Sequence, residues 1–282
     1  MSKKSYKVGI DLGSKAIRVV VTSQEGPDVG HPRVITGAVE PSEGIRHGRI
    51  ISTADAKRAI QNALQKTERE LGEKIQSAFL AITGDYTKTK VVKTRNTVSK
   101  ASNEVSELDF EKAKNEAIAS NLIDSPYDIL NISLSNILLD GKKIRGNPIN
   151  AVGGILETTY NLTLIPKKIL EEYITLFDDL EISIKEIVLG SVVSYIPVTK
   201  RRERIAGVAV LNIGHDNTTL TYFENELPVI NKTWAIGGAN ITNDIALILQ
   251  TKIEDAEDIK KNYKNLNIKK VGNIIEARVQ DL

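Results

Sequence analysis

The stretch that decides the fold is residues 8–15, Val-Gly-Ile-Asp-Leu-Gly-Ser-Lys. An apolar strand leads into an acid, a glycine turn follows, and residues 17–22 return as a second strand rich in β-branched side chains. The pattern predicts two antiparallel strands joined by a tight loop. Glycine in such a loop lets backbone N–H groups approach an anion closely, so the loop is a candidate phosphate site.

The same form occurs again near the other end of the chain. Residues 10–14 read Ile-Asp-Leu-Gly-Ser, and residues 211–215 read Leu-Asn-Ile-Gly-His. Gly237 and Gly238 add a third glycine turn before a predicted helix, whose N-terminus presents free N–H groups. Either loop alone is more often an ordinary β-turn. Together the three turns favour a nucleotide cleft between two related halves.

The first loop carries side chains suited to a metal-bound phosphate. Ser14 offers a hydroxyl and Lys15 offers a cation beside the turn glycine Gly13. Asp11, at the end of the strand, can hold Mg²⁺ through its waters, because Mg²⁺ is usually bound by one or two carboxylates together with phosphate oxygens. Asp11 is therefore the candidate metal ligand and the candidate catalytic residue.

The segments between the two loops predict an α/β protein with an insertion. The chain up to Gly84 reads as three strands, a helix that begins at Ser52 or Thr53, and a fourth strand. A helix opened by Ser106 and a hairpin at Asp140-Gly141 then indicate a small α+β module. We expect four parts: residues 1–84 (first half), 85–165 (inserted subdomain), 166–204 (rest of the first half and a linker) and 205–282 (start of an incomplete second half).

Composition excludes several classes of function. The 38 basic and 36 acidic residues leave a net charge of +2, which argues against a nucleic-acid partner. The chain has no Cys, so thiolate zinc sites, iron–sulfur clusters and Cys nucleophiles are excluded. No apolar run approaches the roughly 18 residues that a membrane span needs. We expect a cytoplasmic protein.

At these motifs the sequence resembles the FtsA family, the actin-like bacterial cell-division proteins. The resemblance runs nearly end to end and includes residues 9–15, 44–48, 82–84, 147–148, 152–153, 237–246 and the helix with Ala256, Glu257 and Lys260. It implies the actin-like (RNase H-like) ATPase fold, with an SHS2-type subdomain as the insertion.

The resemblance also implies ATP and Mg as cofactors and assigns the binding residues. The phosphates would lie against Gly13, Ser14 and Lys15 of the first loop and against the second loop and the following helix start, and the helix with Glu257 and Lys260 would touch adenosine. The second group comprises Asn212, Gly214, Asn217, Thr218, Gly237, Gly238 and Asn240.

Two departures from the family pattern limit what the resemblance implies. The second loop usually reads Asp-Ile-Gly-Gly-Gly-Thr-Thr-Asp, whereas residues 212–219 read Asn-Ile-Gly-His-Asp-Asn-Thr-Thr. The lost acid weakens metal positioning, and Asp216 repels phosphate, so we expect weaker Mg-ATP binding and at most a weak ATPase. The chain also stops before the family's C-terminal amphipathic membrane helix, and residues 274–282 are too short and too weakly basic to replace it.

The function that the resemblance implies is that of a division scaffold. Such a protein assembles into filaments and links the tubulin-like FtsZ to the cytoplasmic face of the inner membrane at the division site. Two alternatives stay open: a pilus-assembly adaptor of the PilM type, which shares the fold and a related insertion, and a phosphotransferase of the same superfamily. The 46–48 loop and the 243–244 helix start match FtsA better than PilM, and only Asp11 offers an obvious catalytic base.

Overall fold

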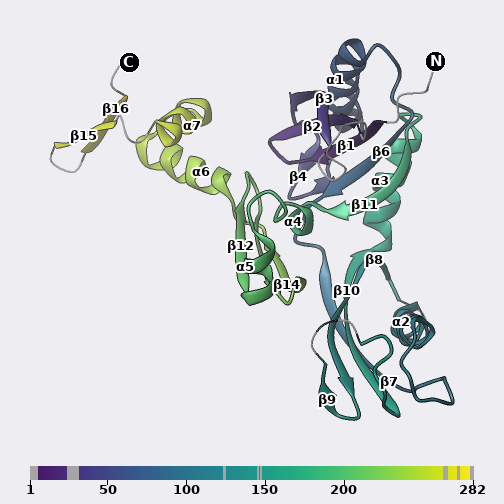
Figure 1. The fold of residues 1–282 in the computed structure, drawn as a ribbon. Helices are drawn as coiled ribbons and strands as arrows, with labels where there is room; N and C mark the ends of the chain where they lie inside the picture. The colour runs from purple at the N-terminus through teal and green to yellow at the C-terminus, as the bar shows by residue number, and fades with distance from the viewer. Residues whose placement is uncertain are drawn as a thin grey trace.

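The computed structural model describes residues 6–23, 32–122, 125–144, 146, 148–262, 266–271 and 274–279. Asn147 and residues 280–282, which belong to segments named above, lie outside the described residues. Figure 1 shows three groups of elements along the molecule: an N-terminal sheet with its helices, a second sheet below it, and a C-terminal group beside them.

The N-terminal sheet has five strands in the order β11-β6-β1-β2-β3. They are β1 (Tyr6–Leu12), β2 (Ala16–Ser23), β3 (Arg33–Pro41), β6 (Ser77–Ile82) and β11 (Ser183–Leu189). β1 pairs antiparallel with β2 and parallel with β6, as a crossover through a helix requires. Alternate residues of β1 are buried, so one face of the sheet carries the core.

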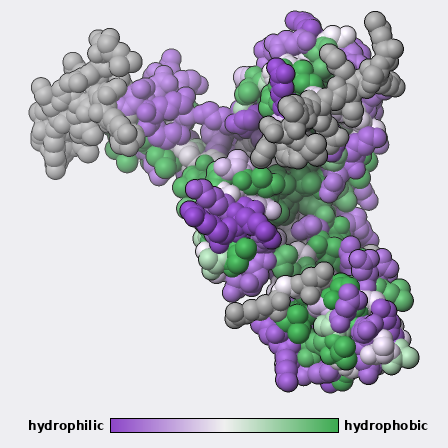
Figure 2. All heavy atoms as spheres, in the orientation of Figure 1, coloured by the Kyte–Doolittle hydropathy of each residue, from purple (hydrophilic) through white to green (hydrophobic). Residues whose placement is uncertain are grey.

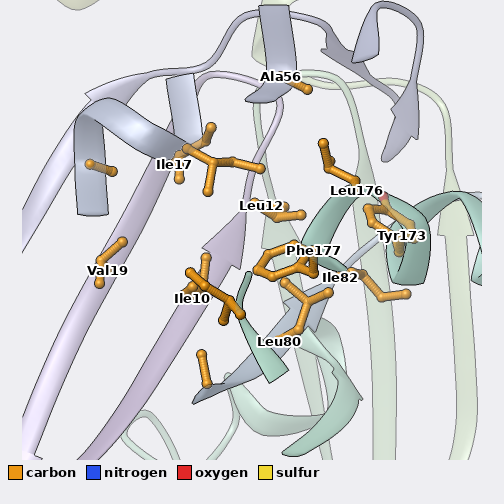
Figure 3. Packing of buried hydrophobic residues seen from close by; sticks show 14 of the residues in the cluster. Ile10, Leu12, Ile17, Val19, Ala56, Leu80, Ile82, Tyr173, Leu176 and Phe177 are labelled. Carbon is orange, nitrogen blue, oxygen red and sulfur yellow. The ribbon is translucent and has the colours of Figure 1, made fainter. Parts of the chain in front are cut away.

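Two helices supply the other side of this core. In α1 (Thr53–Leu71) the Ser52 side chain caps the N-terminus and Gly72, with φ of 81°, ends the helix, as the sequence predicts. α3 (Lys167–Asp178) contributes Tyr173 and Phe177, which are fully buried. Figure 3 shows both side chains packed among residues of β1, β2 and β6. The short strands β4 (Ile45–Arg46) and β5 (Arg49–Ile50) form a small hairpin beside them.

The second sheet has the order β7-β10-β8-β9. It consists of β7 (Lys88–Thr97), β8 (Tyr127–Leu139), β9 (Lys142–Lys143) and β10 (Ile155–Pro166), with α2 (Glu107–Leu122) packed against it. Two clusters of its buried apolar residues are separate from the first core, whereas Ile165 at the end of β10 packs into that core. The hairpin at Asp140-Gly141 is present, with positive φ at both residues, which is typical of a type I′ turn.

The C-terminal group follows a short helix, α4 (Gly190–Val193), that continues from β11. It contains α5 (Arg201–Ala206), the sheet β12-β13-β14, the helices α6 (Gly238–Leu249) and α7 (Ile253–Lys261), and a two-stranded sheet. The strands of these two sheets are β12 (Val208–Ile213), β13 (Thr218–Glu224), β14 (Leu227–Trp234), β15 (Leu266–Val271) and β16 (Ile274–Val279). Hydrophilic residues cover α7, whereas hydrophobic ones gather in the middle of the visible face (Figure 2).

Two sequence expectations about local structure are wrong. The charged segment 199–204, whose run of charges predicts a solvated linker, includes the start of α5, where the N–H of Lys200 donates to the Glu203 carboxylate at 2.7 Å. The charged tail from residue 253 onward is expected to be helical with a short break at residues 265–272, but residues 266–271 pair with 274–279 as antiparallel strands. The division into four parts at residues 84, 165 and 204 stays a prediction. Among the described residues no helix is long and apolar enough to cross a membrane.

Candidate functional site

The first loop is a tight turn between β1 and β2. A Cβ added to Gly13 would lie 2.8 Å from the carbonyl oxygen of Ala16, so this position has little room for a larger residue. The backbone N–H of Ser42 donates to the carbonyl of Lys15 at 3.0 Å and ties the loop to the end of β3. The sequence therefore folds this segment into a fixed loop with Ser14 and Lys15 at its tip.

The second loop joins β12 to β13 in the same way. The N–H of Gly214 donates to the carbonyl of Asn217 at 2.8 Å and closes the turn. Asp216 and Asn217 are buried, and the Oδ1 atom of Asn217 has no hydrogen-bond partner among the described residues. A buried acceptor without a partner is costly, and a bound ligand or water would relieve it.

The two loops line one cavity of about 290 Å³. This volume lies at the small end of the range for ligand pockets, and it suits a chain of phosphates better than a whole nucleotide. Its lining residues are Asp11, Leu12, Gly13, Ser14, Lys15, Ala16, Arg18, Thr83, Asn212, Ile213, Gly214, His215, Asp216, Asn217 and Thr219. The two loops with similar sequences, residues 10–14 and 211–215, therefore lie on the same cavity.

The start of α6 lies behind the second loop and does not line this cavity. The N–H groups of Gly238 and Ala239 donate at 2.8 Å to the carbonyls of Gly214 and His215. A Cβ on Gly237 would lie 2.3 Å from the His215 carbonyl, so only glycine permits this close approach. Asn240 caps the helix by accepting from the N–H of Gly237 at 2.9 Å. In this structure the helix N-terminus supports the loop instead of presenting its N–H groups to an anion.

Glu257 of α7 connects this region to the first loop. Its carboxylate forms an ion pair with Lys15, lies 2.5 Å from the Nζ atom of Lys260, and accepts from the Oγ1 atom of Thr242 at 2.6 Å. Burial opposes ionisation, but the hydrogen bonds from Lys15, Lys260 and Thr242 outweigh it and hold the pKa of Glu257 well below its usual range. Glu257 is therefore a carboxylate at any physiological pH.

Asp11 is paired with a residue that the sequence analysis did not single out. The Nη1 atom of Arg18, on β2, donates to the Asp11 carboxylate at 3.0 Å. Burial raises the pKa of Asp11, and the Arg18 guanidinium partly offsets this shift. The side chain of Arg18 is 52% exposed, so it can move aside for a metal ion without losing buried packing.

A contact between His47 and Asp216 joins the β4–β5 turn to the second loop. The N–H of His47 donates to the Asp216 carboxylate at 3.3 Å, and the ring Nδ1 of His47 lies 3.1 Å from the Asp216 carbonyl. His47 and Gly48 both have positive φ, and a Cβ on Gly48 would overlap the Thr83 carbonyl. The β4–β5 turn therefore has a strained backbone, and Gly48 was the signal for it in the sequence.

The predicted site residues therefore fall into three groups. Asp11, Gly13, Ser14, Lys15, Asn212, Gly214 and Asn217 line the cavity. Gly237, Gly238 and Asn240 support the second loop from behind, and the Thr218 hydroxyl donates to the carbonyl of Ile236 at 2.6 Å. Glu257 and Lys260 form the network that reaches Lys15.

The cavity suits a phosphate group and, in part, a metal. Lys15 and Arg18 supply cations, Ser14 supplies a hydroxyl, and the turns supply backbone donors. Asp11 could hold Mg²⁺ once Arg18 moved away, whereas Asn212 brings no charge. Among the described residues there is no cluster of three or more His, Cys, Asp or Glu side chains that could hold a metal by itself.

Comparisons with known proteins agree with this fold. The family described as cell division protein FtsA matches residues 209–280. The FtsA of Bacillus subtilis (strain 168) is 24% identical, and the match covers 100% of this chain and 69% of the relative. The FtsA of Streptococcus pneumoniae serotype 2 is 22% identical over 93% of this chain and 57% of the relative. The chain thus spans between 57% and 69% of the length of these two relatives.

Solved structures show the fold. A PilM-PilN type IV pilus biogenesis complex superposes with a TM-score of 0.67 at 14% identity, covering 93% of this chain and 70% of the other. The ethanolamine utilization protein EutJ from Carboxydothermus hydrogenoformans superposes with a TM-score of 0.53 at 18% identity. This match covers 93% of this chain and 63% of the EutJ chain. The α/β fold is that of the actin-like ATPases, and the resemblance to FtsA is confirmed along the chain at low identity.

Proposed function

We propose that this chain is part of an FtsA-like scaffold of bacterial cell division, which binds ATP, assembles into filaments and links FtsZ to the cytoplasmic membrane. The observation that carries the proposal is that two loops of the same form, on facing halves of an actin-like fold, line one cavity. The similarity to FtsA along the chain supports the choice of cell division.

In this proposal the phosphates lie between the two loops. Ser14 and Lys15 bind them from one side, and Asn217 binds them from the other, where Gly214 lines the cavity without a free N–H group. Asp11 would hold Mg²⁺ once Arg18 moves away from it, and Glu257 and Lys260 would lie toward the adenosine. ATP would supply a phosphoanhydride bond and Mg²⁺ would neutralise its charge. The adenosine itself would extend beyond the 290 Å³ cavity.

The same residues make hydrolysis slow. A general base must face the attacking water, and Asp11 is hydrogen-bonded to Arg18 at 3.0 Å. Asn212 brings no charge to the metal, and the buried Asp216 places a negative charge beside the phosphates. We therefore propose a nucleotide-binding scaffold with at most weak ATPase activity.

A pull-down with purified FtsZ tests the proposed role. The chain is immobilised and incubated with FtsZ from the same organism, with Mg-ATP present, and PilN from a pilus system is offered in a parallel experiment. We expect FtsZ to be retained above the level of bare resin and PilN not to be retained. Retention of PilN without FtsZ would overturn the division role in favour of a pilus-assembly adaptor.

A further inference from the structure

Glu257 is unusual because it joins groups from both halves of the molecule. Lys260 and Thr242 approach it from the C-terminal helices, at 2.5 Å and 2.6 Å. Lys15 approaches it from the first loop, far away in sequence. The Nζ atom of Lys261 also lies 3.7 Å from the carboxylate. One carboxylate thus binds the same ammonium group that the cavity offers to an anion.

The partners of Glu257 are not equally fixed. The side chains of Glu257 and Lys260 are 15% and 22% exposed, and Lys260 also donates to the Gly238 carbonyl at 3.1 Å. The Lys15 side chain is 48% exposed, and among the described residues its ammonium has Glu257 as its acceptor. If Lys15 turned toward the cavity, Glu257 would keep Lys260 and Thr242. The exchange would therefore leave no buried charge without a partner.

We propose that Glu257 sets the affinity of the phosphate site by competing with the ligand for Lys15. A bound phosphate takes the Lys15 ammonium, and Glu257 retains its partners on α6 and α7. The competition favours ligands with a strongly anionic terminal group, because a weaker anion cannot displace a carboxylate that is already hydrogen-bonded. Binding also breaks an ion pair that joins the two halves. This proposal rests on the proposed phosphate site.

Inorganic tripolyphosphate tests the competition without any contribution from adenosine. Calorimetric titration compares wild type with Glu257→Gln, which keeps the shape and the Thr242 hydrogen bond but removes the charge. We expect the Kd for tripolyphosphate to fall about tenfold. The matched control is Glu254→Gln on the same helix, an exposed residue with the same change of charge; its Kd should stay within about twofold of wild type, because salt screens exposed charges.

Two more variants separate competition for Lys15 from a general charge effect. In a Lys15→Gln background, Glu257→Gln should no longer raise the affinity for tripolyphosphate, since the Lys15 ammonium that it would release is absent. If Glu257→Gln does not fold, Glu257→Asp keeps the charge but shortens the reach to Lys15, and it should raise the affinity by a smaller factor.

The outcomes distinguish this proposal from the proposed function. If wild type binds tripolyphosphate and Glu257→Gln binds it no more tightly, the competition is refuted while the phosphate site stands. If neither protein binds tripolyphosphate or Mg-ATP, both proposals are overturned. If Glu257→Gln raises the affinity for tripolyphosphate by the same factor in the Lys15→Gln background as in wild type, the effect is one of general electrostatics. The competition for Lys15 is then refuted.

Discussion

Single residues explain why the cavity has its present chemistry. The four charged side chains that line it, Asp11, Lys15, Arg18 and Asp216, bring two charges of each sign. Arg18 is paired with Asp11, and Lys15 is paired with Glu257, so each cation already has an acceptor. Any phosphate must compete for these cations. This is a stronger physical reason for the proposed weak binding of nucleotide than the changed sequence of the second loop alone.

A substitution at Gly237 tests directly whether the start of α6 supports the second loop. Its position leaves no room for a Cβ beside the His215 carbonyl, so Gly237→Ala should push the second loop and the start of α6 apart. We expect a loss of about 1–3 kcal/mol of unfolding free energy, the usual effect of overpacking. Urea denaturation followed by circular dichroism measures it.

Gly9 is the matched control for this substitution. A Cβ there would meet nothing within 4 Å, and the residue lies in a strand without positive φ. Gly9→Ala should therefore leave the stability unchanged or raise it by up to about 1 kcal/mol. Equal losses in the two variants would contradict the close-packing argument for Gly237.

At the scale of elements, the sequence predicts well those segments whose ends carry local signals. Ser52 and Gly72 bound α1, and the hairpin at Asp140-Gly141 forms as expected, because caps and turns act through neighbouring residues. The tail at 266–279 and the helix α5 do not follow the expectation. Strand pairing between distant residues leaves little local signal, and charge runs fit both loops and short helices.

The start of α2 gives a prediction about pH. The Asp109 carboxylate accepts from the N–H of Ser99 at 2.8 Å and from the N–H and hydroxyl of Ser106 at 2.9 Å and 2.7 Å. Burial opposes ionisation, but these bonds outweigh it and lower the pKa of Asp109 to about 2. Because the pKa of Asp109 is lower in the folded state, its ionisation stabilises the folded state fully at pH values above the unfolded pKa of about 3.9. This stability is lost as the pH falls through about 2.

Asp109→Asn should therefore destabilise the protein by about 2 kcal/mol at pH 7, because charged hydrogen bonds become neutral ones. The difference from wild type should shrink steadily below pH 4. Unfolding in urea at pH 7 and at pH 3 measures both values. Glu107→Gln, an exposed acid in the same first turn, is the control and should cost less than about 1 kcal/mol. A difference that did not depend on pH would count against the ionised cap.

At the scale of the whole molecule, two halves face each other across the cavity. The short helix α4 connects them and contacts β13 and β14. Polar contacts between described residues of the two halves include the ion pair of Lys15 with Glu257 and the hydrogen bonds of His47 with Asp216. The repeated loop motif was enough to predict that the halves face each other. These side-chain contacts were not predictable, since nothing in the sequence says which residues meet across a cleft.

The central claim is that the two loops form one phosphate site that uses Lys15. Calorimetric titration of Mg-ATP into wild type and Lys15→Gln tests it most directly. The account predicts saturable binding by wild type with a Kd weaker than about 1 μM, and a loss of at least about tenfold in Lys15→Gln. Lys112→Gln, an exposed residue of α2 with the same change of charge, should bind as wild type does. Equal affinity in wild type and Lys15→Gln, or no binding by wild type, would contradict the claim.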